Sequence, residues 1–225
     1  MRPVTLVLAI AVLAAGGCRK SETPAAARVF AVQGTVTLTH LGQSMTLTEK
    51  QSAPLHAGDS VAAGAASEAV IESAGHVTYL RENGHLVLAA PAPRAREDAP
   101  MRVELLRGLA TFLVPRAQKP ADYRFEAVTN SVVAAVRGTR FTVEAAEDRT
   151  RIAVTSGSVD LLAVTDRKVL ATVKDGQEAS AAPGASSAVT VTPMAADELK
   201  RQSREQAGMS ILFEALGTGI TIGVY

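Results

Sequence analysis

The sequence predicts an all-β protein: an antiparallel β-sandwich or barrel-like domain over residues 29–193, followed by a short C-terminal helix. Three observations lead to this class. Short runs rich in Val, Thr, Leu and Ile alternate with polar residues, which is the period of a half-buried strand. Turn residues such as Gly, Asn, Asp and Pro interrupt the runs about every 8–12 residues, as in sandwiches and barrels. No long helical period interrupts this part of the sequence.

Residues 1–17 are typical of a signal peptide rather than of a folded domain. Arg2 supplies a positive start, and the apolar run Val4–Ala15 has the length of a signal-peptide core. It is shorter than the roughly 20 apolar residues that a membrane span needs. The run leads into "LAAGGC", which resembles the lipobox that precedes the lipidated cysteine of bacterial lipoproteins. In the usual lipobox a Leu stands where this chain has Ala15.

Cys18 is the only cysteine of the chain, and its place directly after the signal predicts that it is the lipidation site. The alternative is a small apolar residue at the end of an ordinary cleaved signal. Acylation would anchor the protein to a membrane without a span, since each buried CH₂ contributes about 0.8 kcal/mol. It also rules out a disulfide within the chain. Because Arg19 and not Asp follows the cysteine, we expect attachment to the periplasmic face of the outer membrane.

The charge balance argues against nucleic acid as a partner. The chain has 23 Lys+Arg and 22 Asp+Glu, and Arg2 is the only charged residue before Cys18. From Cys18 onward, basic and acidic residues are therefore equal in number, at 22 each. Domains that bind nucleic acid carry a basic surface, whereas the Lys and Arg residues here are scattered among acidic ones.

Residues 18–28 have the polar, Pro-containing composition of a linker, and the β pattern begins at Val29. The first clear strand places Val36 and Leu38 on one face and threonines on the other. With 4% aromatic residues, the core must consist mainly of Val, Leu, Ile and Ala.

The middle of the chain carries several turn signals. Turns are expected at residues 73–75 and 82–84, and the Asn83–Gly84 pair in the second one predicts a β-hairpin. The run from Met101 to Val114 is interpreted as two strands joined around Arg107–Gly108. Residues 90–100, rich in Pro and charge, are interpreted as an exposed loop.

Gly138 interrupts an apolar strand pattern and is flanked by Arg137 and Arg140, at the entry of a predicted hairpin. A glycine in such a place marks a bulge, a bend or a close approach of two backbones. One of the two arginines could bridge the sheets to a carboxylate such as Glu126 or Asp160. We favour a structural corner over a ligand grip, and we expect Gly138→Val to unfold the protein or block its export.

The segment 130–163 resembles the signature of the FecR domain family, in which a V-R-G-T-x-F strand entry precedes a hairpin and a V-x-x-G-x-V strand. The opening strands of that family also match, and the resemblance covers residues 29–193. At the turn after them the family commonly has Asp-Gly-Ser, whereas this chain has Ala74-Gly75-His76. The matching residues are Leu55, Gly58, Asp59, Val61, Gly64, Ser67, Ala69, Val136, Arg137, Gly138, Thr139, Phe141, Val154, Gly157 and Val159.

The founding member of that family passes an outer-membrane signal to a cytoplasmic sigma factor through a membrane span. We find neither a cytoplasmic segment nor an internal span in this chain, so we do not expect an anti-sigma role. The resemblance instead implies a non-catalytic, lipid-anchored envelope protein that binds a protein or an envelope polymer. The alternative is a periplasmic signalling component that acts through a separate partner.

The residues give little support to enzyme chemistry, and we expect no enzyme, no cofactor and no metal site. No G-x-S-x-G motif is present. The histidines lie in separate turns with no pair at metal-ligand spacing, although His76 and His85 could approach each other. The glycines near the C-terminus do not form a dinucleotide-binding motif. Carboxylates at alternate strand positions face water by default.

Residues 194–225 fall outside the β pattern and are interpreted as a helix plus an apolar tail. Acidic Asp197 and Glu198 come first and bases follow as far as Arg204, an order that suits the helix dipole, and Gly208 could end or kink the helix. We expect Gly217–Tyr225 to add a short strand to a sheet edge of this domain or of a partner. The alternatives are a disordered end and a terminal membrane span, which the charge of Glu214 disfavours.

Overall fold

The computed structural model describes residues 25–89, 100–116, 125–184 and 188–215, with side chains as far as Met209 at the C-terminal end. The predicted lipidation site Cys18, the signal peptide and the tail 217–225 lie outside these residues, as does most of the loop 90–100. The remaining chain is all-β with one C-terminal helix, as predicted.

Seventeen strands in the described part of the chain form two layers, sheet A and sheet B. In spatial order, sheet A contains β4 (Ser52–Leu55), β1 (Ala27–Gln33), β6 (Glu68–Ser73), β7 (His76–Leu80), the second half of β9 (Met101–Val114), β12 (Thr139–Ala145), β13 (Thr150–Ser156), β16 (Gln177–Ala181) and β17 (Val189–Pro193). Sheet B contains β3 (Gln43–Thr48), β2 (Thr35–His40), β5 (Ser60–Ala63), β8 (His85–Leu88), the first half of β9, β10 (Phe125–Val128), β11 (Val133–Val136), β14 (Ser158–Leu162) and β15 (Val169–Lys174).

The architecture is a sandwich and not a closed barrel. The outermost strands of sheet A are β4 and β17, those of sheet B are β3 and β15, and the pairings of the described strands do not join them. The pairs are antiparallel except for β9 with β10, which is parallel. This exception arises because β9 ends in sheet A, so the chain re-enters sheet B beside the first half of β9.

Strand β9 belongs to both sheets and bends at Gly108. Residues up to Arg107 pair with β8 in sheet B, and residues from Gly108 pair with β12 in sheet A. The φ of Gly108 is 90°, and a Cβ added there would lie 2.6 Å from the Cα of Gly84. The two backbones can approach this closely because neither residue carries a side chain.

Two of the predicted turns are therefore corrected. The run from Met101 to Val114 is one bent strand and not two strands joined at Arg107–Gly108. Asn83–Gly84 does not close a hairpin, because β7 lies in sheet A and β8 in sheet B. The turn signal there marks a crossover between the layers. The turn at Ala74–Gly75 does close a hairpin, between β6 and β7.

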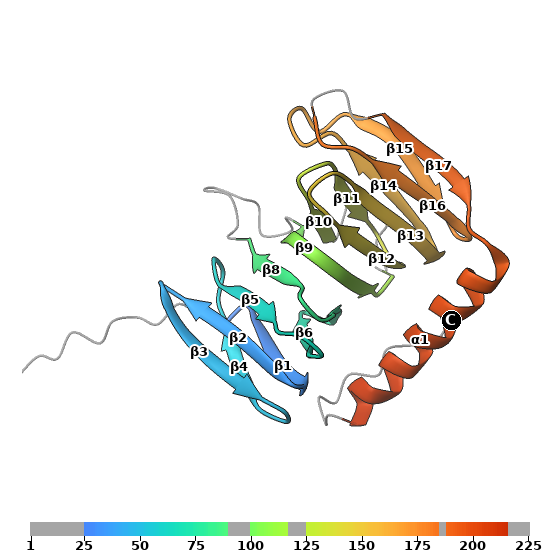
Figure 1. Cartoon of the computed structure of the whole chain (residues 1–225). Coiled ribbons are helices and arrows are strands. Elements are labelled where there is room, and N and C mark those ends of the chain that lie inside the picture. Colours follow the sequence, from blue (N-terminus) through green and yellow to red (C-terminus); the bar gives the residue numbers. More distant parts are fainter. Residues whose placement is uncertain (1–24, 90–99, 117–124, 185–187, 216–225) are drawn as a thin grey trace, which may run out of the picture.

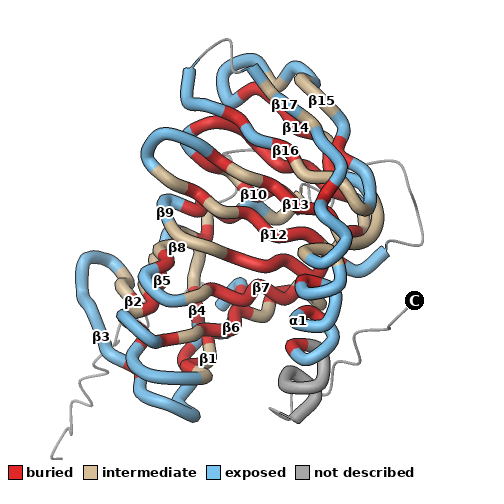
Figure 2. The backbone as a smooth tube through the Cα atoms, turned by 45° about the vertical axis from the view of Figure 1, so that its right-hand side comes forward, coloured by how far each residue is buried: buried red, intermediate tan, exposed pale blue. Residues whose placement is uncertain are grey.

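The core fills the space between the two sheets and consists mostly of Val, Leu and Ala, as the composition predicted. Three buried phenylalanines lie at its centre. Phe112 of sheet A stacks on Phe141 of the same sheet at 5.0 Å between ring centroids, and contacts Phe125 of sheet B at 5.3 Å. Figure 2 shows the alternation of buried and exposed residues along the strands that this packing requires.

The strands before and after β9 form two halves of the molecule. Strands β1–β8 lie on one side of β9 and strands β10–β17 on the other, in both sheets (Figure 1). Strand β1 begins at Ala27 and β17 ends at Pro193, so the β region nearly coincides with the residues 29–193 expected from the sequence.

Helix α1 (Ala196–Ala215) lies along the outer face of sheet A (Figures 1 and 2). It continues through Gly208, so of the two possibilities considered for this glycine, an end or a kink, the end is wrong. Because the helix extends to Ala215, the basic residues Lys200, Arg201 and Arg204 lie within it and not in its last turn. Of the charge order predicted to suit the helix dipole, the acidic half is confirmed, since Asp197 and Glu198 lie in the first turn, and the basic half is wrong.

Candidate binding surfaces

The V-R-G-T-x-F residues lie where the chain crosses from sheet B to sheet A. Val136 ends β11 and Thr139 begins β12, so Arg137 and Gly138 form the crossover. Gly138 has a φ of 150°, and a Cβ there would lie 2.6 Å from the Cα of Arg116. Side chains rarely adopt such a φ. Both the bend and the close approach of two backbones are present at this glycine.

The rest of the signature makes contacts within the fold. The hydroxyl of Thr139 is buried and donates a hydrogen bond to the carbonyl oxygen of Ser158, at 2.8 Å. Gly157 has a φ of 92°, and a Cβ on it would lie 2.8 Å from the carbonyl oxygen of Gly138. Phe141 belongs to the core. These contacts hold the crossover against the neighbouring connection between β13 and β14.

Of the two carboxylates expected near the arginines, Asp160 pairs with Arg137 and Glu126 has other partners. Arg137 follows β11 directly and pairs at 3.6 Å with Asp160 on the neighbouring strand β14, so the ion pair links the crossover to sheet B and does not bridge the two sheets. Glu126 is buried and is bound by Arg102 at 3.0 Å and by Arg167. The sequence did not indicate these two partners, because each is at least 24 residues from Glu126 in the chain.

The signature crossover also lines a shallow depression of about 240 Å³. Arg116 and Arg137 lie on its wall together with the carboxylate of Asp160. The contacts of the signature residues themselves lie within the fold.

Helix α1 contacts sheet A through a stripe of mostly polar side chains. Gln202 and Gln206 are buried at helical spacing, and Met209 follows one turn later. The hydroxyl of Thr155 donates to the side-chain oxygen of Gln206 at 2.5 Å. Met209 packs with an apolar cluster on the sheet, where its carbonyl oxygen accepts a hydrogen bond from the hydroxyl of Tyr79. The attachment of α1 therefore depends on hydrogen bonds more than on apolar area.

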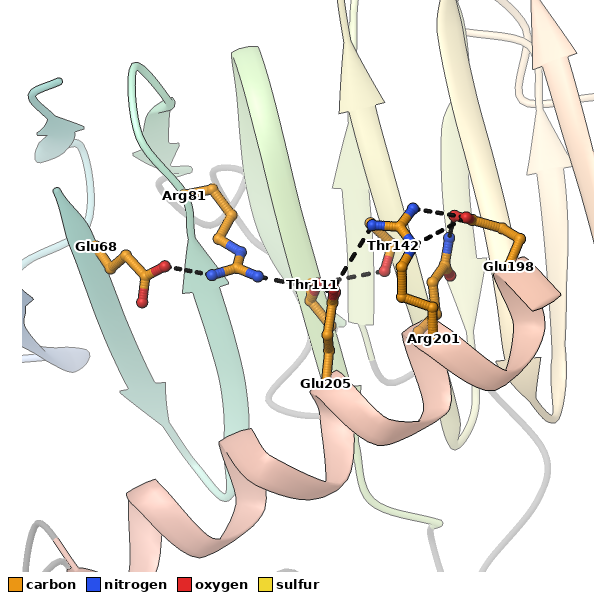
Figure 3. Close-up of polar contacts among 8 residues, drawn as sticks. Glu68, Arg81, Thr111, Thr142, Glu198, Arg201 and Glu205 are labelled. Atoms are coloured by element: carbon orange, nitrogen blue, oxygen red, sulfur yellow. Dashed lines mark hydrogen bonds and ion pairs between the residues drawn. The ribbon is translucent and has the colours of Figure 1, made fainter. Parts of the chain in front are cut away.

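A chain of ion pairs runs along the exposed flank of α1 and onto sheet A (Figure 3). Arg201 donates to Glu198 at 2.6 Å and lies 3.6 Å from Glu205. Arg81, on the sheet side, pairs with Glu205 at 3.7 Å and with Glu68. Such pairs contribute little individually at an exposed site, but together they orient the helix.

The ionisation of Glu198 depends on these contacts. Hydrogen bonds from Arg201 and then from Gln202 lower the pKa of Glu198. The same hydrogen bond raises the pKa of Arg201.

Beneath the helix, a cavity of about 210 Å³ is lined by Arg151, Gln202 and threonine side chains of β9 and β12. Among the described residues, none donates a hydrogen bond to the buried side-chain oxygen of Gln202.

The two edges of sheet B differ in chemistry. Strand β3 has the sequence QSMTLT, without a charged residue, and all its side chains except Leu47 are exposed. Met45 in this strand is 50% exposed, and Leu41 in the preceding turn is 90% exposed. Strand β15, at the other edge, ends in Lys174 and follows Lys168. Proteins usually protect edge strands with charges, so β3 is the less protected edge.

The histidines do not all stay apart, which corrects the prediction that none of them forms a close pair. His40 and His56 approach each other with ring centroids 4.8 Å apart, on either side of the buried carboxylate of Asp59. His76 packs against the ring of Phe125 at 5.6 Å. His85 lies in β8, where burial and the charge of Arg107 lower its pKa.

The buried hydroxyls near these surfaces bond to other hydroxyls or to carbonyl oxygens. Thr111 and Thr142 contact each other at 3.2 Å beneath α1, and Thr139 bonds to a backbone carbonyl. An activated nucleophile instead needs a neighbouring base.

In the described part of the chain, no helix has the length and apolar character needed to cross a membrane.

In a comparison with known proteins, one family model matches part of the chain. Residues 59–160, from β5 to β14, match the family model described as FecR protein. Among curated proteins, none matches the sequence. Two crystal structures of a proposed anti-sigma factor from Parabacteroides distasonis ATCC 8503, at 1.65 and 2.50 Å resolution, are similar to the chain. Each is 16% identical with a TM-score of 0.48, and the match covers 63% of this chain and 62% of that protein.

Proposed function

Because residues 59–160 of this chain form a FecR domain, we propose that the protein is a non-catalytic bacterial envelope protein that binds a partner protein or an envelope polymer. In this proposal, lipid on Cys18 anchors it to the periplasmic face of the outer membrane. The family match and the lipobox-like sequence before Cys18 support this proposal.

The open edge of sheet B is the observation that carries the binding role. Strand β3 has no neighbouring strand on one side, and no residue within the strand is charged. An extended segment of another protein can add to such an edge through main-chain hydrogen bonds, while exposed side chains give specificity. Met45 and Leu41 are the exposed apolar side chains available for that purpose. The edge therefore favours a protein partner over a polymer.

A crosslinking experiment in intact cells tests this role. A photo-reactive amino acid replaces Met45 on β3 or, as the matched control, Val169 on β15. The two side chains are 50% and 52% exposed and lie at opposite edges of the same sheet. We expect discrete protein adducts from a crosslinker at position 45 and from one at position 41, and Met45→Lys should abolish the adduct from position 41. Adducts from position 169 alone, or crosslinks to glycan alone, would contradict the strand-addition proposal.

Lipid anchoring has a separate test. Cells that grow with a labelled fatty-acid analogue should label the wild-type protein and not Cys18→Ala. Equal labelling of both proteins would contradict the lipoprotein assignment, and fractionation of the labelled protein would distinguish the outer from the inner membrane.

The attachment of α1 favours a second candidate function, a regulatory component that acts through a separate partner. The helix is held by hydrogen bonds and ion pairs that a partner's polar groups could replace. A deletion strain separates the two functions. A binding module gives an envelope or assembly defect, whereas a regulatory component changes the expression of one regulon.

A further inference from the structure

The cluster of His40, His56 and Asp59 is formed by the pairing of β2 with β5. The register places Thr39 opposite Ser60, so the next residue on each strand, His40 and Asp59, also lie side by side. His56 belongs to the connection that leads from β4 into β5. Its position three residues before Asp59 brings its imidazole to the same carboxylate.

Asp59 is held in a fixed position by the backbone. Its side chain is 3% exposed, and one carboxylate oxygen accepts a hydrogen bond from the backbone N–H of His56 at 2.7 Å. The other oxygen lies 2.6 Å from Nδ1 of His40. The Nδ1 atom of His56 is 3.5 Å from the first oxygen. Two imidazoles thus converge on one buried carboxylate.

These distances suit a small divalent cation. Two ligand atoms about 2.1 Å from a tetrahedral zinc ion lie about 3.4 Å apart. The separation of His56 and Asp59 already has this value, at 3.5 Å. His40 contacts the other carboxylate oxygen, at 2.6 Å, so its imidazole has to turn to share a cation with His56, and its side chain, 45% exposed, has room to do so. One ligand atom from each of the three residues already lies within 4.8 Å of the other two.

We propose that His40, His56 and Asp59 bind a zinc-class divalent cation, with two imidazole nitrogens and one carboxylate oxygen as ligands. Imidazole favours zinc, copper and nickel, whereas calcium and magnesium require oxygen ligands. The half-exposed side of His40 leaves a fourth position for water or for a donor group of another molecule. The site is therefore accessible and exchangeable, rather than an enclosed structural zinc site.

The site also lies beside the open edge of sheet B. His40 ends β2, and the turn that begins with Leu41 leads directly into β3. A bound cation would fix this turn and add a positive charge there. The metal site does not depend on strand addition, because its three ligands are all within one chain.

Titration calorimetry tests the site with the full-length chain, purified in detergent without a polyhistidine tag. We expect wild type to bind one Zn²⁺, with Mg²⁺ and Ca²⁺ at the same concentrations giving no heat. His40→Gln and His56→Gln should each weaken zinc binding at least tenfold, and Asp59→Asn should also weaken it. The matched control is His85→Gln, since His85 lies in the same sheet outside the cluster. It should bind zinc as wild type does.

Thermal melting with and without Zn²⁺ gives a second measurement. Because an ion that binds the folded state raises the melting temperature, zinc should raise it for wild type and His85→Gln. It should not do so for His40→Gln or His56→Gln. Melting without zinc shows that each variant is folded. The proposal would be overturned if wild type did not bind zinc, or if the His40 and His56 variants bound zinc as tightly as wild type.

Discussion

At the scale of single residues, the crossover at Gly138 is formed by backbone geometry. Its φ of 150° and its approach to the Cα of Arg116 leave no place for a side chain. The neighbouring Thr139 and Gly157 fasten the crossover from the other side. A family signature can therefore mark a corner of the fold, while the side chains that meet a partner lie elsewhere.

Gly138→Val should lower the free energy of unfolding by more than about 2 kcal/mol, because it combines a strained φ with a steric clash. Chemical denaturation of the purified variant measures the change. The matched control is Gly208→Ala, since a Cβ at that helical position meets no described atom within 4 Å. This control should keep or raise stability, by up to about 1 kcal/mol. A wild-type stability for Gly138→Val would contradict the structural role.

Glu126 gives a second prediction at the residue scale. Its carboxylate is buried, whereas Arg102 and Arg167 are 44% and 37% exposed. The double variant Arg102→Ala/Arg167→Ala leaves a buried charge unpaired, which should cost about 3–5 kcal/mol of stability. Glu126→Gln should cost less, because the arginines can turn to water. Denaturation curves of the two proteins test this order, and the reverse order would contradict it.

At the scale of elements, α1 contacts the sheet through a polar face, so its attachment depends on hydrogen bonds and ion pairs. The buried residues follow helical spacing, yet Gln202 and Gln206 occupy positions where a tightly packed helix would carry Leu or Ile. The pairs of Arg201 with Glu198 and Glu205 add orientation at the exposed flank.

Acid should loosen α1. The pKa of Glu198 is lower in the folded than in the unfolded chain, so its contribution to stability is fully present above the unfolded value, about 4.3. The contribution is lost as the pH falls through the lower folded pKa. Hydrogen exchange along residues 196–209 at pH 7 and below pH 4, with each rate divided by the intrinsic amide rate at that pH, should show lower protection in acid. In Glu198→Gln this acid-induced loss of protection should be smaller, and an equal loss would assign the effect to other groups.

Much of the element pattern was predictable from the sequence, but the partners of each element were not. The alternation around Val36 and the turn at Ala74–Gly75 depend on local chemistry, and the structure confirms both. Asn83–Gly84 has the same local chemistry as a hairpin turn, but its strands enter different sheets because Gly84 has to meet Gly108. A period of two residues specifies the buried face of a strand and not the sheet that it joins.

The cluster around Asp59 was missed for a related reason. His40 is 19 residues from Asp59 in the chain, and the register of two strands brings them together. Spacing rules detect metal ligands on one helix or one turn, whereas this set comes from the end of β2 and from the connection between β4 and β5. In the sequence, Asp59 stood out only because it matches the family pattern. That pattern did not indicate that histidines would lie beside its carboxylate.

At the scale of the whole molecule, β9 joins the two sheets and the two halves. Strands on both sides pair with it, and one continuous core of buried side chains spans both halves. The domain should therefore unfold as one cooperative unit and not as two.

Gly108→Val tests this cooperativity, because its Cβ would meet the Cα of Gly84 at 2.6 Å. We expect scanning calorimetry to show a single transition in wild type and a single transition at lower temperature in the variant. Leu106→Ala, at a 51% exposed position of the same strand, is the control and should melt near wild type. Two separate transitions in either protein would show that the halves unfold independently.

The bend in β9 also has a mechanical consequence. A molecule tethered at its first strand and pulled at its last transmits the load from one half to the other through the hydrogen bonds of β9. In the antiparallel pairs these bonds are perpendicular to the strands, so tension along β9 loads them in shear, and tension across a sheet peels them pair by pair. The two sides of Gly108 pair within different sheets. Load that passes along β9 is therefore divided between the hydrogen bonds of both sheets.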